Sequence, residues 1–238
     1  IWNNSGFFTG SKGEIITSRL ALLGAHRAEA KTSDGITYPI TKVLAEDKAS
    51  GLVIVLASTP KPVTALSLSS SVPQTGEKIM VVSQFGRGVD DGGVSGIREI
   101  PELGKVYEIT ASIFTSLIGS PVINPRGEVI GVASLKLAKE GSPYFIIPSE
   151  YIKNLKVGGG EPLEEWAKRN SCEEEIERLQ RELEKNPEDA HSYLIIGICN
   201  RKLGKYDSAV EFFSQVTRLR PDFPDAYNNL GNAYYYSG

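Results

Sequence analysis

The first 148 residues carry short runs of alternating or β-branched apolar residues that are separated by turn residues. Residues 14–17, 51–57 and 78–82 are such runs, and Ser33-Asp34-Gly35 is one of the turns. Short strands at this spacing are typical of sandwiches and barrels. The pattern therefore predicts an all-β domain, which we place at residues 1–156.

One segment of this domain has the pattern of a hairpin with a tight loop in front of it. Residues 121–124 and 128–133 are β-type runs joined by Pro125-Arg126-Gly127, whose Pro and Gly favour a turn. Residues 116–121 predict a bent loop that the strands behind it hold in place. Many hydrolases carry a nucleophile on such a loop, and the residue at its tip here is Ile118.

Residues 84–96 contain five glycines, with Asp90 and Asp91 among them. A phosphate-binding loop is one interpretation, but no strand-to-helix context and no P-loop lysine accompany these glycines. We therefore predict a flexible loop between two strands.

The composition changes after residue 156. The glycine-rich residues 157–162 predict a linker, and helices are predicted over residues 163–170 and 172–185. We divide this part into a linker and short helix at residues 157–171 and helical repeats at residues 172–238.

The repeats are visible as a self-similarity at a spacing of 34 residues, which aligns Tyr193 with Tyr227 and Gly197 with Gly231. Aromatic, Leu-Gly, Tyr, Ala, Phe and Pro positions at fixed offsets resemble the tetratricopeptide repeat (TPR), although Asn200 stands where that pattern has Tyr. The resemblance implies an α-helical solenoid with Tyr193, Phe213 and Tyr227 in its core. Because the pattern stops inside a repeat, we expect further repeats beyond Gly238 or a partner that covers the end.

Four polar residues lie off the packing positions of the first helix of each repeat: Arg201, Lys202, Asn228 and Asn232. We predict that they face the concave side and contact a partner protein or peptide. Plain solvated surface is the alternative that the pattern leaves open.

Composition narrows the classes of function. The net charge of −3 gives no general argument for binding nucleic acid, and no apolar run approaches the ~20 residues of a membrane span. His26 and His191 are far apart and lack metal-ligand spacing, so we predict no metal and no other cofactor. Cys172 and Cys199 lie in separate regions, which favours free thiols over a disulfide.

Six segments of the β-domain, together with Gly119 and Pro121, resemble trypsin-like serine proteases of the HtrA/Do type: residues 4–8, 13–17, 33–35, 97–101, 109–111 and 127–132. The resemblance implies two six-stranded β-barrels with a cleft between them. It also implies a Ser-His-Asp triad, in which His takes the proton of the Ser nucleophile and Asp orients the His.

All three triad places are changed in this sequence. Leu20 stands at the place of the His, Gly51 at that of the Asp and Ile118 at that of the Ser. None of these side chains can transfer a proton or attack a carbonyl. We therefore predict a pseudoprotease, with Leu20 and Ile118 filling the former cleft, that acts as a non-catalytic scaffold or assembly subunit.

Two alternatives stay open. One is a serine endopeptidase with a rearranged or partner-completed site, built from Ser120 or Ser116 with His26 or from a residue supplied in trans. The oxyanion hole is also expected to be impaired, because Ser116 is not Gly and the β-branched Ile118 disfavours a strained turn. The other alternative is a peptide-sensing module that regulates an active protease.

The resemblance also frames the expected partners and location. We expect other proteins or peptides to bind the TPR concave face and edge strands of the β-domain, together with self-assembly. The sequence names no compartment, and a soluble protein of a bacterial periplasm or a cytoplasm-like compartment is the expectation.

Overall fold

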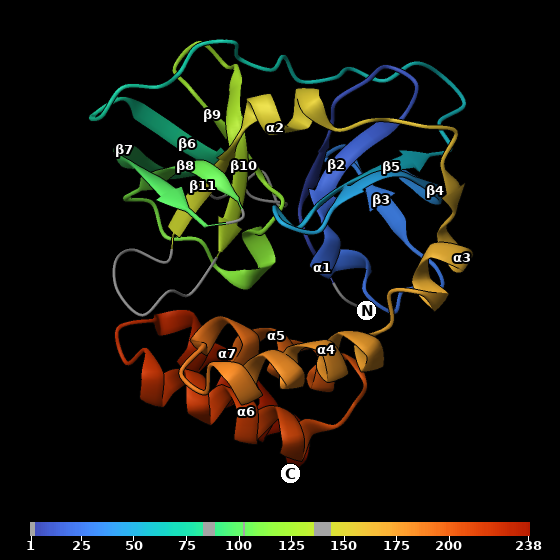
Figure 1. Cartoon of the computed structure of the whole chain (residues 1–238). Helices are drawn as coiled ribbons and strands as arrows, with labels where there is room; N and C mark the ends of the chain where they lie inside the picture. The colour runs from blue at the N-terminus through green and yellow to red at the C-terminus, as the bar shows by residue number, and fades with distance from the viewer. Residues whose placement is uncertain (1–2, 83–88, 102, 136–143) are drawn as a thin grey trace. The chain divides into compact units, whose positions relative to one another are not determined.

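The computed structural model describes residues 3–82, 89–101, 103–135 and 144–238. It divides into two compact units, a β-rich one that ends at Ala167 and a helical one that begins at Lys168. Figure 1 follows the chain through the strands of the first unit and the helices α4 to α7 of the second.

The β-rich unit begins with an antiparallel six-stranded sheet. Its path is β1 (Gly6–Phe8), β2 (Glu14–Ser18), β5 (Leu52–Ala57), β4 (Thr37–Asp47) and β12 (Glu161–Pro162), and β3 (Glu29–Lys31) also pairs with β4. The short helix α1 (Arg19–Leu22) follows β2. Among the described strands the two ends of this path do not pair, so the first of the two expected barrels is not confirmed.

The other six strands form a closed barrel: β6 (Lys78–Val82), β7 (Val89–Ile100), β8 (Gly104–Ile109), β9 (Pro121–Ile123), β10 (Val129–Leu135) and β11 (Tyr144–Pro148). A 3₁₀ turn, η1 (Thr115–Leu117), precedes β9, and helix α2 (Ser149–Asn154) follows β11. Strands β9 and β10 form the predicted hairpin. Its turn is held by Asn124, whose Oδ1 accepts from the backbone N–H groups of Arg126 at 2.9 Å and Glu128 at 3.0 Å.

The prediction of a flexible glycine-rich loop is wrong for the residues that the structure describes, because residues 89–96 belong to strand β7. The remainder of the predicted loop, residues 84–88, lies outside the described residues. Gly92 pairs with Ile79 of β6, and a Cβ at Gly92 would lie 2.7 Å from the backbone N of Ala111. Glycine at this position therefore permits a close approach of two backbones rather than a flexible loop.

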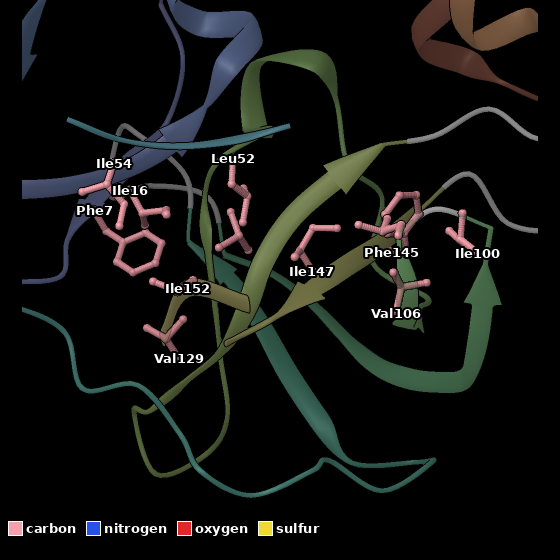
Figure 2. Packing of buried hydrophobic residues seen from close by; sticks show 12 residues of the cluster. Phe7, Ile16, Leu52, Ile54, Ile100, Val106, Val129, Phe145, Ile147 and Ile152 are labelled. Atoms are coloured by element: carbon pink, nitrogen blue, oxygen red, sulfur yellow. The ribbon is translucent and has the colours of Figure 1, made fainter. Parts of the chain in front are cut away.

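The core of this unit follows the period of two along β5. Leu52 and Ile54 join a buried cluster that continues into the barrel with Val129, Phe145 and Ile147, as Figure 2 shows. Val53, Val55 and Ala57 point to the other face and join a second cluster. Because both faces of β5 are covered, its sequence is a continuous apolar run rather than an alternating one.

The second cluster includes helix α3 (Leu163–Lys168), which the sequence analysis assigned to a linker segment. Trp166 is 1% exposed, and its indole Nε1–H donates to Oε2 of Glu46 at 3.0 Å. The preceding strand β12 pairs with β4 through Glu161 and Val43. The compact β-rich unit therefore extends to Ala167, beyond the predicted limit at residue 156, because apolar burial holds this segment on the sheet.

The helical unit consists of α4 (Cys172–Lys185), α5 (Ala190–Lys202), α6 (Tyr206–Leu219) and α7 (Pro224–Ser237), and each helix packs against the next. Ser171 and Asp189 cap α4 and α5 by accepting backbone N–H groups of the first turn. Gly197 of α5 lies against the buried ring of Phe213 from α6. Among the described residues, no helix is both long and apolar enough to cross a membrane.

Candidate functional site

The places that the resemblance assigns to the His and the Asp lie next to each other at the start of α1. Leu20 is in the first turn of α1, where its backbone N–H donates to Oγ of the N-cap Ser18 at 3.2 Å. The preceding residue, Arg19, donates its backbone N–H to the carbonyl of Gly51 at 2.7 Å. Gly51 has a φ of +68°, a conformation that favours glycine over residues with a side chain.

The loop with Ile118 at its tip is a type II β-turn from Leu117 to Ser120. The Ser120 N–H donates to the Leu117 carbonyl at 2.9 Å, Ile118 has φ −60° and ψ 126°, and Gly119 has φ +95°. A type II turn needs a positive φ at its third residue, and Gly119 supplies it. The strain expected from a β-branched residue is absent, because Ile118 stands at the second position with an ordinary extended backbone.

This turn is held against the N-terminal sheet. A Cβ on Gly119 would lie 2.5 Å from the carbonyl oxygen of Ser5 and 2.9 Å from the backbone N of Ser18. The Ser5 hydroxyl donates to the carbonyl of Ser116 at 3.3 Å, and the Thr17 hydroxyl donates to the carbonyl of Ser5 at 2.6 Å. The structure thus brings the loop of Ile118 beside the strand that leads into Leu20.

The side chains at the tip of the loop and on α1 are shielded from water to different degrees. Ile118 is 8% exposed, and Leu20 is half-buried. Neither side chain lies in open solvent. Open exposure of both side chains would have rejected the prediction that they fill the former cleft. Direct contact between Leu20 and Ile118 stays a prediction.

The residues of the alternative endopeptidase site differ in their exposure. Ser120 is 0% exposed, and its Oγ has no hydrogen-bond partner among the described residues. His26 is exposed in the segment after α1, and Ser116 is exposed as well. A buried hydroxyl cannot meet a substrate carbonyl, so Ser120 is not presented as a nucleophile in this conformation.

The described residues contain no group of three or more His, Cys, Asp or Glu side chains arranged to hold a metal ion.

The four predicted protein-contact residues fall into two kinds. Asn228 and Asn232 are exposed on α7, as a partner contact requires. Arg201 and Lys202 are half-buried, and burial lowers the pKa of each of them. Asp225 opposes this shift at Arg201, so part of that guanidinium's charge is balanced inside the helical unit.

Sequence reasoning missed the exposed tyrosines of α7. Tyr227, which was predicted to pack in the repeat core, is 50% exposed, because no described helix packs on that side of α7. Tyr234, Tyr235 and Tyr236 are 57%, 80% and 61% exposed. Three consecutive tyrosines cannot share one helix face, so this run was the signal that some of them reach solvent.

Comparison with protein families agrees with both resemblances. Residues 4–132 match the model of the trypsin-like peptidase domain, which is more than half of the 238 residues. Residues 200–238 match the model of the TPR repeat.

Several individual relatives are serine proteases with HtrA names, and another is the anti-sigma-I factor RsgI9 of Acetivibrio thermocellus, which is 24% identical over 152 residues. Serine protease HTRA1 of Xenopus tropicalis is 32% identical over 164 residues, which are 64% of this chain and 35% of that protein. Serine protease Do-like HtrB of Bacillus subtilis is 29% identical over 161 residues, with 60% of this chain and 35% of that protein covered. The chain thus spans about a third of the length of these two serine proteases, and it belongs to the trypsin-like peptidase domain family, with a TPR repeat in its C-terminal helices.

Proposed function

We propose that this chain is a non-catalytic protein-interaction scaffold or assembly subunit, built from an inactive trypsin-like domain and a TPR solenoid. The observation that carries the proposal is the loop at residues 117–120. It presents an isoleucine at its tip, while the hydroxyl next to it, on Ser120, is fully buried. A serine mechanism needs an accessible hydroxyl with a base in hydrogen-bond reach.

The two other triad places support the same conclusion. Leu20 has no proton to exchange, and Gly51 has no side chain at all. Gly51 also has a positive φ, so an aspartate there would adopt a conformation that non-glycine residues rarely use. The departure from the triad therefore involves the backbone as well as the side chains.

The protein-binding surface is proposed to be the helical unit. TPR repeats stack into extended surfaces that take up peptides or helices, and Asn228 and Asn232 are exposed on α7. Strand addition to β1 is the weaker route, because the Phe8 carbonyl at its edge already accepts the Leu66 N–H at 2.9 Å.

A fluorophosphonate probe tests the loss of catalysis, because it labels an activated serine and leaves a structural one unmodified. We expect the folded chain to remain unlabelled and to leave casein intact under conditions in which trypsin is labelled and active. The Ser120→Ala variant should behave identically. Casein hydrolysis that disappears in Ser120→Ala would instead establish the rearranged endopeptidase.

Affinity capture tests the binding function. The full chain is used as bait beside an Asn228→Ala/Asn232→Ala variant and a Lys78→Ala variant, which changes an exposed residue of the β-barrel. We expect the captured proteins to be lost from the double variant and kept by Lys78→Ala. Equal capture by all three baits would place the binding surface elsewhere.

A further inference from the structure

Four residues of helix α7 form a solvent-exposed stripe that consists of tyrosine and glycine. Tyr227, Gly231, Tyr234 and Tyr235 follow one another at steps of four, three and one residues, so they lie on one side of the helix. All four are exposed, and the three tyrosines are 50%, 57% and 80% exposed. A single exposed aromatic residue needs no explanation, but three on one helix face indicate an interaction surface. We call these four residues the α7 stripe.

The ring of Tyr235 is supported by neighbouring rings. It meets the ring of Tyr236 edge-on with the ring centroids 5.1 Å apart, and Tyr236 stacks on Tyr206 of α6 at 5.4 Å. The Ser237 hydroxyl donates to Oδ1 of Asp207, which links the same end of α7 to α6. Tyr235 is thus held from one side while it remains 80% exposed, and a side chain held in this way loses less freedom when it enters an interface.

Gly231 leaves an open space in the middle of the stripe. Nothing lies within 4 Å of the position at which its Cβ would stand. The equivalent residue of the sequence repeat, Gly197, is covered by α6, and the Phe213 ring lies 2.6 Å from its Cβ position. The repeat therefore shows which contact such a glycine permits, namely the close approach of a second helix.

The chemistry of the stripe fits a second copy of the same chain. In a two-fold contact the same surface stands on both sides, so an exposed charge near the axis would be repelled by its own copy. Asp225 is the charged residue of α7, and it is 1% exposed. The tyrosine hydroxyls, and the amide of Asn228 beside the stripe, both donate and accept hydrogen bonds, so they can pair with their own kind. A partner recognised by its charge would meet no exposed charged side chain on α7.

We propose that the α7 stripe is a self-association surface, through which two copies of this chain form a two-fold, antiparallel pair of α7 helices. The axis passes close to Gly231, where the absence of a side chain allows the closest approach. Tyr227 of each copy then faces Tyr235 of the other, because both residues are four positions from Gly231. The inference rests on the proposed scaffold function and deepens it, since it names a second copy as a partner of the helical unit.

The size of the stripe predicts a weak dimer. At about 200 Å² for one fully buried aromatic side chain, the exposed parts of the three tyrosines offer roughly 400 Å² per chain. A standard interface takes ~800 Å² from each partner. The pair should therefore form and dissociate with concentration rather than persist as a permanent dimer.

Sedimentation velocity of the full chain tests the pairing over about 1 µM to about 1 mM, the range in which weak complexes dissociate. We expect the mass of one chain to rise to that of two and no further, because a two-fold contact closes at the dimer. Gly231→Glu should remain monomeric, since it places two carboxylates at the axis, and Tyr235→Ala should raise the dissociation constant about tenfold. Gln180→Glu adds the same charge at an exposed site of α4 and should dimerise like the unchanged chain.

Three outcomes would each overturn the proposal: the mass of one chain at every concentration, association beyond the dimer, or equal association of Gly231→Glu and Gln180→Glu. Circular dichroism verifies that Gly231→Glu is folded, which we expect because the site is open and glutamate has the higher helix propensity. Failure of the scaffold function is recognised separately, since it appears as casein hydrolysis by the chain.

Disulfide trapping tests the position of the axis without an added charge, and it does not depend on the folding of Gly231→Glu. The two native cysteines are buried free thiols, so they do not compete in the folded chain. In a glutathione redox buffer, Gly231→Cys should form a disulfide between two chains, because the axis brings the two Cα atoms within the ~7 Å that a disulfide spans. Gln180→Cys, at the exposed site on α4, should cross-link only at the rate of random collision. Equal rates of cross-linking in the two variants would contradict an axis at Gly231.

Discussion

Gly119 determines how the loop of Ile118 is attached to the rest of the β-rich unit. Its φ of +95° closes the type II turn, and the space where a side chain would begin is occupied by the Ser5 carbonyl and the Ser18 amide. Two requirements therefore coincide at one residue: a backbone conformation that favours glycine and a contact that admits no Cβ.

We expect Gly119→Ala to destabilise the protein by about 2–4 kcal/mol, because the strained φ and the steric overlap add together. Denaturant unfolding of the full chain measures the change. Gly127→Ala is the matched control, since Gly127 also has a positive φ of 77° but nothing lies within 4 Å of its Cβ position. That variant should lose only about 1–2 kcal/mol, and an equal loss in both variants would contradict the contact argument.

The three places of the triad show which properties of single residues can be predicted from the sequence and which cannot. Motif order and spacing along the chain predict Leu20, Gly51 and Ile118 as these places, and this assignment stays a prediction. The complete burial of Ser120 was not predictable. It depends on how the turn packs against strands that are distant in the sequence.

At the scale of elements, the two equivalent glycines of the repeat have different surroundings. A Cβ on Gly197 would lie 2.6 Å from the Phe213 ring, whereas nothing lies within 4 Å of the same position on Gly231. The sequence repeat makes these residues equivalent, but only Gly197 has a helix packed against it in the described part of the chain.

This difference predicts opposite effects of the same substitution. Gly231→Ala should stabilise the helical unit by up to ~1 kcal/mol, because alanine has the higher helix propensity. Gly197→Ala should destabilise it by about 1–3 kcal/mol, since the added methyl displaces the buried Phe213 ring. Thermal unfolding followed by circular dichroism at 222 nm compares the two variants, and destabilisation by Gly231→Ala would show that another segment covers α7.

Strand β7 shows where element prediction from local pattern fails. Its glycines lower the propensity for a strand, and the sequence alone favoured a loop. The neighbouring strands β6 and β8 supply the hydrogen bonds, and the close approach at Gly92 requires the missing side chain. Tertiary pairing therefore overrides local propensity here.

At the scale of the whole molecule, the burial of Trp166 assigns the segment after the barrel to the β-rich unit. It is fully buried in the cluster on the N-terminal sheet, together with Leu163 and Ala167. The glycine-rich pattern before it suggested a linker, and burial on a distant sheet is not visible in such a pattern.

Trp166→Ala should destabilise the β-rich unit by about 3–5 kcal/mol, which is the usual cost of removing a buried tryptophan. Hydrogen–deuterium exchange should show faster exchange in β2, β4 and β5, with α5 to α7 unchanged. The conservative Trp166→Phe keeps most of the apolar volume and loses the hydrogen bond to Glu46, so it should cost about 1–2 kcal/mol. Faster exchange confined to the helices would contradict this assignment.

The sequence by itself determined the features that depend on neighbouring residues. The β-type runs, the hairpin around Pro125-Arg126-Gly127, the helix of residues 172–185 and the 34-residue repeat all follow from period, turn chemistry and spacing. The family resemblance also rests on motif order, and it is confirmed by the match over residues 4–132.

Only the tertiary structure decided which distant residues meet. It closed one set of strands into a barrel, buried Ser120 and placed Trp166 on the N-terminal sheet. The physical reason is that burial and contact arise from packing between segments far apart in the chain. Local pattern restricts which faces are apolar, but it does not specify which of them pack together.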